Sequence, residues 1–149
     1  MKLLVFICFA VFYTNATNIS PETLGNIVLK VKEIIKPCVQ STGATEDDAI
    51  NFMGGKTPTS KEGKCMVACF YKEAGLGFEN GEIKDNNGFG DAIKSEDPDF
   101  YAAKLKITQE CHSEIPKSDD DCEYYAKMYE CNVNKSKEAK IAFSLFSRK

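Results

Sequence analysis

The chain has 149 residues, a formal net charge of −3 at pH 7, seven cysteines, one histidine and no tryptophan. Its 19 basic residues are scattered among 22 acidic ones and do not gather on one segment. This distribution argues against nucleic acid or an anionic membrane as a partner. The length suits one domain of ordinary size.

The first 16 residues have the composition of a secretory signal peptide. Lys2 precedes an apolar run from Leu3 to Tyr13, and small residues surround Ala16. This run is shorter than the stretch of about 20 apolar residues that a membrane-spanning helix needs. We therefore expect residues 1–16 to be removed and residues 17–149 to form a single domain. The protein is then secreted and extracellular, without insertion into a membrane.

The cysteine content of the mature chain predicts disulfides. Removal of residues 1–16 takes Cys8 and leaves six of the seven cysteines, and an even number in an exported chain favours pairing. Three disulfides are more than a filled core of this size requires. An internal pocket of about 300 Å³ would destabilise the fold by on the order of 7 kcal/mol, which disulfides at about 2–4 kcal/mol each would offset. Disulfides that only protect a filled core outside the cell are an equal alternative.

The first two helices follow from capping residues and apolar spacing. Ser20 caps a helix that begins at Pro21 and continues with 3.6-residue apolar spacing toward Cys38. The segment from Thr45 to Asp48 resembles a capping box and opens a short second helix. We expect Ile50 and Phe52 to form its apolar side and Gly54-Gly55 to end it.

Four further helices are expected along the chain. Their capping segments are Ser60, Asp85 to Asn87, Asp97-Pro98, and Ser118 to Asp121, and their expected ends are Gly75, Ile93, Cys111 and Cys131. The stretch Glu79-Asn80-Gly81 has turn composition. Because no segment alternates convincingly with a period of two, the sequence predicts an all-α fold.

Helical geometry limits the disulfide pairing without fixing it. Cys65 and Cys69 are four positions apart, so they share a helix face and point to different neighbours. Cys122 and Cys131 are nine positions apart and lie on opposite faces of their helix. Excluding pairs within each of these helices leaves ten of the fifteen possible pairings open.

The spacing of the mature cysteines is C-x26-C-x3-C-x41-C-x10-C-x8-C. Together with the segments KCMVACFYKEAGLGFENGEI and CEYYAKMYECN, this spacing resembles that of insect odorant-binding proteins of the pheromone and general odorant-binding family. The resemblance extends over the whole mature chain. It implies six or seven helices around an internal apolar cavity, cross-linked by interlocked disulfides that would here be Cys38–Cys69, Cys65–Cys122 and Cys111–Cys131.

The function that the resemblance implies is a secreted carrier of small hydrophobic ligands such as odorants or pheromones. A membrane chemoreceptor is the further partner of such a carrier, and a monomer or weak homodimer is expected. A carrier of fatty acids or other lipids outside olfaction is the alternative within this fold. From another class comes a disulfide-stapled inhibitor or toxin with a filled core, which acts through its surface. Uptake of an apolar probe distinguishes the carriers from this last class.

The apolar helix faces supply the candidate ligand-binding residues. They are Val31, Ile34, Phe52, Met66, Phe70, Leu76, Phe78, Phe89, Ile93, Leu105, Tyr124 and Met128, with Phe143 and Phe146 from the C-terminal tail. We expect about half to line the pocket and the others to be core residues. Tyr124 or Tyr125 would offer a hydroxyl to the ligand, although such a hydroxyl more often contacts solvent or backbone.

The C-terminal segment IAFSLFSRK carries Ile141, Phe143, Leu145 and Phe146 in an otherwise polar tail. Apolar side chains at a terminus usually cover another apolar surface. We expect the tail to pack on the pocket or its mouth, and packing on an outer groove is the alternative.

Other chemistries are poorly supported by the sequence. A zinc site at Cys65 and Cys69 would lack the C-x2-C pairs and second histidine of usual sites. An EF-hand loop starting at Asp85 would have Phe89 at position 5, so capping of a helix is the better interpretation of that segment. Catalytic motifs of the GxSxG or HExxH type are absent. We expect no enzyme activity, no cofactor and no metal.

Two further features concern protonation and modification. His112 is the only histidine, so we expect ligand affinity to depend weakly on pH between 7 and 5. The tripeptides Asn18-Ile19-Ser20 and Asn134-Lys135-Ser136 match the acceptor motif for N-linked glycans. Short motifs of this kind also arise by chance, so glycosylation stays open.

Overall fold

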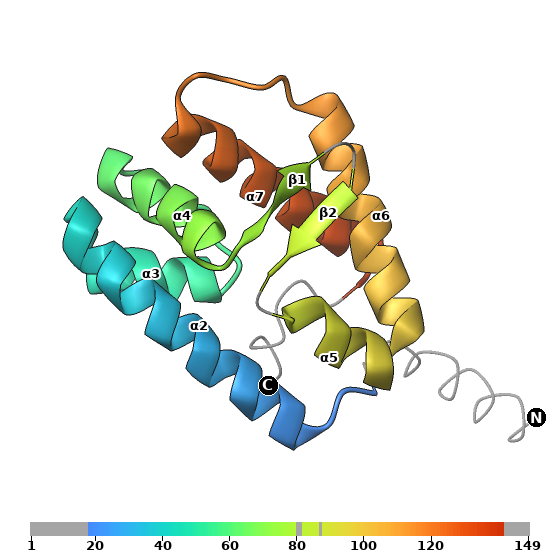
Figure 1. Ribbon diagram of the computed structural model, residues 1–149. Helices are drawn as coiled ribbons and strands as arrows, with labels where there is room; N and C mark the ends of the chain where they lie inside the picture. Colours follow the sequence, from blue (N-terminus) through green and yellow to red (C-terminus); the bar gives the residue numbers. More distant parts are fainter. Residues whose placement is uncertain (1–17, 80–81, 87, 142–149) are drawn as a thin grey trace, which may run out of the picture.

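A computed structural model of the chain describes residues 18–79, 82–86 and 88–141. Within these residues it contains six α-helices and one pair of strands (Figure 1). In chain order they are α2 (Pro21–Thr42), α3 (Glu46–Met53), α4 (Lys61–Glu73), β1 (Leu76–Glu79), β2 (Glu82–Asp85), α5 (Phe89–Glu96), α6 (Pro98–Glu114) and α7 (Asp121–Glu138). The all-α fold class is confirmed. The expected signal peptide, residues 1–16, lies outside the described residues.

The predicted caps of the first two helices are confirmed. The Ser20 hydroxyl accepts a hydrogen bond from the Thr23 amide at 3.2 Å, at the start of α2. Thr45 and Asp48 form a reciprocal capping box on α3, with distances of 3.0 Å and 3.1 Å between each side-chain oxygen and the other residue's amide nitrogen. Asp serves here in place of the usual Glu because its carboxylate reaches the cap amide.

Polar side chains also cap α4, α6 and α7 as the sequence predicts. The residues are Ser60, Asp97 and Asp120, and each accepts a hydrogen bond from the amide three positions later. The start of α5 differs, because its cap is Gly88 in the left-handed region, with φ of 69°. The Asp85 carboxylate still accepts a hydrogen bond from the Gly90 amide in the first turn of α5.

Three sequence-based expectations about local structure are wrong. No strand is expected from the sequence, but β1 and β2 pair, with Leu76 opposite Asp85 and Glu79 opposite Glu82. An Asn-Gly pair is the usual two-residue connection of a hairpin, but strands of four residues are too short to show clear alternation. Ile50 does not join the apolar side of α3, since 61% of it is exposed. Helix α7 continues past Cys131 to Glu138.

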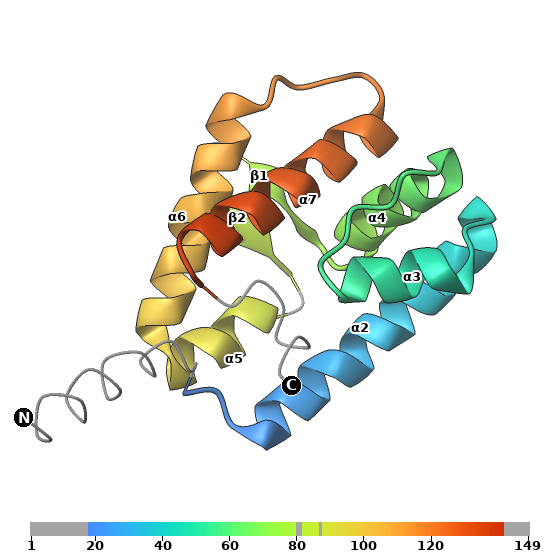
Figure 2. The same ribbon diagram turned by 180° about the vertical axis from the view of Figure 1, so that it is seen from behind.

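Helix α7 lies between α4 and α6 in both views of the molecule (Figures 1 and 2), and three disulfides tie these helices together. Cys38–Cys69 joins α2 to α4, with 5.7 Å between the Cα atoms. Cys65–Cys122 joins α4 to α7 at 4.3 Å, and Cys111–Cys131 joins α6 to α7 at 5.8 Å. These are the pairs that the family resemblance implied, and one turn of α4 is therefore bound on two sides.

The buried apolar residues form two clusters. The larger one joins α2, α3, α4 and α7, and it includes Met66, Phe70 and Tyr129. The Tyr129 ring packs 4.6 Å from the ring of Phe52, and its hydroxyl donates a hydrogen bond to the Phe52 carbonyl. A smaller cluster of Ile107, Cys111 and Met128 lies between α6 and α7. Among the described helices, none is both long and apolar enough to cross a bilayer.

Candidate functional site

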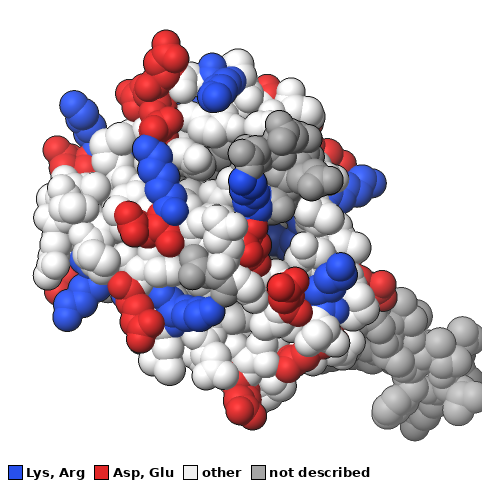
Figure 3. All heavy atoms as spheres, viewed as in Figure 1, with Lys and Arg blue, Asp and Glu red and all other residues white. Residues whose placement is uncertain are grey.

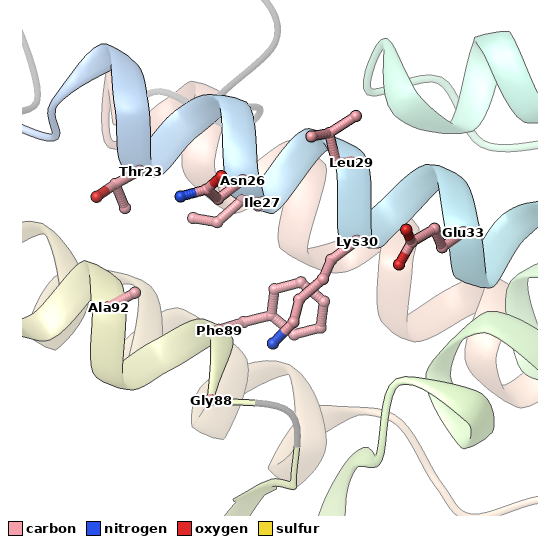
Figure 4. Close-up of a pocket in the computed structure, with 9 residues that line it drawn as sticks. All are labelled: Thr23, Asn26, Ile27, Leu29, Lys30, Glu33, Gly88, Phe89 and Ala92. Carbon is pink, nitrogen blue, oxygen red and sulfur yellow. The ribbon is translucent and has the colours of Figure 1, made fainter.

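A groove of about 360 Å³ lies between α2 and α5 (Figure 4). The lining residues of α2 are Thr23, Asn26, Ile27, Leu29, Lys30 and Glu33, and Gly88, Phe89 and Ala92 line the groove at α5. On α2, Thr23, Ile27 and Lys30 are spaced by four and three residues, so they share one helix face. The volume lies within the range of about 300–1,000 Å³ that is usual for small-molecule sites.

The groove combines an apolar floor with a few polar groups. Ile27 is buried, and Phe89 is half-buried on the facing helix. The Lys30 ammonium extends from α2 to a point 5.5 Å from the centre of the Phe89 ring (Figure 4). A cation over the face of an aromatic ring is attracted by the ring quadrupole. The groove can therefore hold an apolar ligand and offer it hydrogen bonds from the α2 wall.

A carboxylate outside the groove bonds to Thr23, one of the lining residues. The Thr23 hydroxyl donates a hydrogen bond to Glu96 at 2.6 Å, across from α2 to the last residue of α5. The Ser20 amide donates a second one at 2.6 Å. The hydrogen bonds from the Thr23 side chain and the Ser20 backbone lower the pKa of the Glu96 carboxyl, because they stabilise its charged form.

The predicted ligand-binding residues occupy several different environments. Phe89 lines the groove. Val31, Phe52, Met66 and Phe70 are buried in the larger cluster, and Met128 is buried in the smaller one. The half-buried candidates are Ile34, Leu76, Ile93, Leu105 and Tyr124. Phe78 lies in β1 opposite Ile83, but its side chain is outside the description, as are Phe143 and Phe146.

Most groove residues were not among the sequence candidates. The candidates lie on apolar helix faces, whereas a mixed strip of polar and apolar side chains lines the groove on α2. Ile27 belongs to the apolar pattern of α2 and lies in this strip, which was the available signal. No sequence pattern marks Thr23, Asn26 and Lys30 as groove residues, because their place in the groove depends on the packing of α5 against α2.

A polar seam runs between α6 and α7. The Lys104 ammonium donates a hydrogen bond to the Ser136 hydroxyl at 2.8 Å, and the Thr108 hydroxyl donates one to the side-chain oxygen Oδ1 of Asn132 at 2.8 Å. Burial lowers the pKa of Lys104 to about 8. These bonds align two helices that share only a small apolar cluster.

The seam continues to a predicted ligand-binding residue. His112 Nδ1 lies 3.0 Å from the hydroxyl of Tyr124. The neighbouring Tyr125 ring stacks on Tyr71, with 5.2 Å between the ring centres. Burial, with the nearby Tyr125 hydroxyl as a smaller cause, raises the pKa of Tyr124 above its ordinary value.

The distribution of surface charge and the state of the cysteines bear on nucleic-acid binding and on metal binding. On the face shown in Figure 3, basic and acidic side chains are intermixed, in agreement with their scatter along the sequence. Cys65 and Cys69 are both in disulfides and so cannot ligate zinc as thiolates. Over residues 18–79, 82–86 and 88–141, no three or more His, Cys, Asp or Glu side chains form a group that could hold a metal ion.

Comparisons with known proteins agree on one family. The model of the PBP/GOBP family matches residues 21–135. The chain is 25% identical to General odorant-binding protein 19d of Drosophila melanogaster over 108 residues. These residues make up 71% of this chain and 71% of the relative. It is 29% identical over 96 residues to General odorant-binding protein 28a of the same species, covering 63% of this chain and 66% of the relative.

A solved structure shows the same fold. This chain is similar to the solved structure of odorant-binding protein dmelOBP28a from Drosophila melanogaster, with a TM-score of 0.58 and 27% sequence identity. The similarity covers 79% of this chain and 98% of the solved chain.

Proposed function

Because the chain belongs to the PBP/GOBP family of odorant-binding proteins, we propose that it carries small hydrophobic ligands, such as odorants or pheromones, through aqueous extracellular fluid. Members of this family are carriers of small ligands and not enzymes. The expected signal peptide and the three disulfides support secretion. Delivery to a membrane chemoreceptor is part of the proposal.

The groove between α2 and α5 is the observation that supports ligand binding most directly. Its apolar residues, Ile27, Phe89 and Ala92, face each other across two helices. Burial of apolar ligand surface against them supplies non-directional affinity, at about 25 cal/mol per Å² before the costs of binding. We infer that Phe89 contacts the ligand and that the half-buried Ile93 and Leu76 extend the apolar wall.

The test is a titration of the mature, oxidised protein with an uncharged anilinonaphthalene dye whose emission rises in apolar surroundings. The absence of tryptophan keeps the protein background low. We expect saturable binding in the micromolar range with one site per chain. Phe89→Ala should weaken binding by about tenfold through lost apolar contact.

The matched control for Phe89→Ala is Ile50→Ala, because Ile50 is an exposed apolar residue on α3 outside the groove. The control should bind the dye as the wild type does. If the folded, fully oxidised protein shows no saturable binding, the carrier function is wrong and action through the surface becomes the better explanation. Equal effects of both variants would place the ligand elsewhere.

A carrier of fatty acids is the second candidate, and one feature of the groove favours it. Lys30 and Asn26 place hydrogen-bond donors on the α2 wall, beside the apolar floor. A carboxylate head group would pair with the Lys30 ammonium, although Glu33 in the same wall reduces this preference by its like charge. Competition of the bound dye with fatty acids, long-chain alcohols and small aromatic volatiles separates the two candidates.

A further inference from the structure

Two adjacent carboxylates hold the start of α2 against the corner between α5 and α6. Glu96 is the last residue of α5, and Asp97 is the N-cap of α6. Asp97 is buried and accepts a hydrogen bond from the Asn18 amide at 2.8 Å. Glu96 accepts three hydrogen bonds from Ser20 and Thr23. We call these two carboxylates and their partners Asn18, Ser20 and Thr23 the Glu96 clasp.

The bonds to Glu96 are short and link distant parts of the chain. The Ser20 amide and hydroxyl lie 2.6 Å and 3.0 Å from its two oxygens, and the Thr23 hydroxyl lies 2.6 Å away. The bonded residues are 73 to 76 positions apart in the sequence. Hydrogen bonds to an ionised carboxylate are roughly twice as strong as those between neutral groups. The clasp is therefore a strong contact between α2 and α5 that does not depend on apolar packing.

The position of the clasp relates it to the groove. Thr23 lines the groove and also donates to Glu96. The groove residues Phe89 and Ala92 precede Glu96 on the same short helix. Lys30 contacts Phe89 at a point about 10 Å farther along α2, as calculated from the helical rise per residue. The two walls are thus joined near Thr23 by the clasp and near Lys30 by the Lys30–Phe89 contact.

We propose that Glu96 is a positioning residue for ligand binding, whose hydrogen bonds to Ser20 and Thr23 hold α2 against α5 and slow the release of ligand from the groove. Differences in affinity between related binding sites arise mostly from dissociation rates. The inference rests on the proposed function, because it concerns the same groove. Glu96 itself does not line the groove.

Stopped-flow displacement of the anilinonaphthalene dye tests the proposal. We expect dissociation to be about tenfold faster in Glu96→Ala. Thr23→Val removes one hydrogen bond while keeping the side-chain shape, so it should accelerate dissociation by a smaller factor. It also tests the proposal if Glu96→Ala does not fold. The control is Glu62→Gln, which alters an exposed acid in the first turn of α4, outside the groove.

A second readout needs no ligand. Amide hydrogen exchange at Ser20 should be faster in Glu96→Ala than in wild type, because the Ser20 amide loses the carboxylate that accepts its hydrogen bond. Exchange at Ser20 should be unchanged in Glu62→Gln. Dye binding with wild-type dissociation rates in both clasp variants, or unchanged exchange at Ser20, would overturn the inference and leave the proposed function standing. Failure of the wild type to bind the dye would overturn both.

Discussion

Lys104 is a cation placed where its charge is unfavourable. It donates a hydrogen bond to Ser136, which has no exposed surface, and burial lowers its pKa to about 8. In the unfolded chain the pKa returns to about 10.5. Between these two values the unfolded state binds more protons than the folded state, so the free energy of unfolding rises with pH.

This linkage predicts a pH-dependent difference between the wild type and Lys104→Met. We expect the free energy of unfolding of the wild type, relative to this variant, to rise by about 2 kcal/mol between pH 7 and 9.5. Urea unfolding at several pH values measures it. Lys32→Met, at an exposed position of α2, is the control and should show no such trend. Parallel pH profiles for wild type and Lys104→Met would contradict the prediction.

The single histidine limits pH control of ligand affinity. His112 lies 3.0 Å from the hydroxyl of Tyr124, and neither residue lines the groove between α2 and α5. One group changes affinity by at most tenfold for each pKa unit by which the ligand shifts it. We expect less than a tenfold change in dye affinity between pH 7 and 5, measured by titration. A larger loss would show that carboxylates control binding.

At the scale of elements, two glycines in helices should respond oppositely to the same substitution. Gly25 lies in α2, exposed, and a Cβ there would meet nothing within 4 Å. Gly63 lies in the first turn of α4, where a Cβ would be 2.7 Å from Pro58 Cβ and 2.7 Å from an Asp48 oxygen. The Asp48 carboxylate is fixed by the α3 capping box and by the Ser60 hydroxyl.

Gly25→Ala should therefore stabilise the fold by about 0.5–1 kcal/mol, because alanine favours the helix. Gly63→Ala should destabilise it by about 1–3 kcal/mol despite the same propensity gain, because the added methyl displaces the cap of α3 and the turn before α4. Urea unfolding of the two variants beside wild type is the measurement. A stabilised Gly63→Ala would mean that Pro58 and Asp48 move aside freely.

The C-terminal tail is the element whose role is least determined by the fold. Ile141 packs against the smaller apolar cluster, and the residues after it lie outside the description. The sequence predicts that Phe143, Leu145 and Phe146 cover the pocket, so we expect truncation after Lys140 to accelerate dye dissociation severalfold. The full-length variant Ile141→Ala loses only the contact of Ile141 with the smaller apolar cluster and keeps the residues after it. It therefore separates the effect of that contact from the effect of removing the tail. Unchanged affinity and dissociation in the truncated protein would contradict a role at the pocket.

At the scale of the whole molecule, the sequence predicted local features better than the site. The caps at Ser20, Thr45 and Ser60 follow from short-range hydrogen bonding, so the sequence specified them. Periodicity left ten disulfide pairings open, and the family resemblance selected the observed one. Thr23 and Lys30 could not be identified as groove residues, because a groove arises only when α5 packs beside α2.

The order of the three disulfides also determines what a protease can release. Every peptide bond between Cys38 and Cys131 lies within at least one closed loop, since the loops overlap in sequence as Cys38–Cys69, Cys65–Cys122 and Cys111–Cys131. Pairing each cysteine with the next one along the chain would leave stretches outside any loop. A single cut in this region therefore frees no fragment.

Limited trypsin digestion can show this, since Lys117 lies exposed between α6 and α7. Cleavage there should leave one covalent molecule, heavier by one water, which separates into two peptides only after reduction. Release of a fragment without reductant would contradict the observed pairing. A nicked molecule would keep α2 and α5 on the same covalent framework, so damage to the backbone in a protease-rich fluid need not empty the groove.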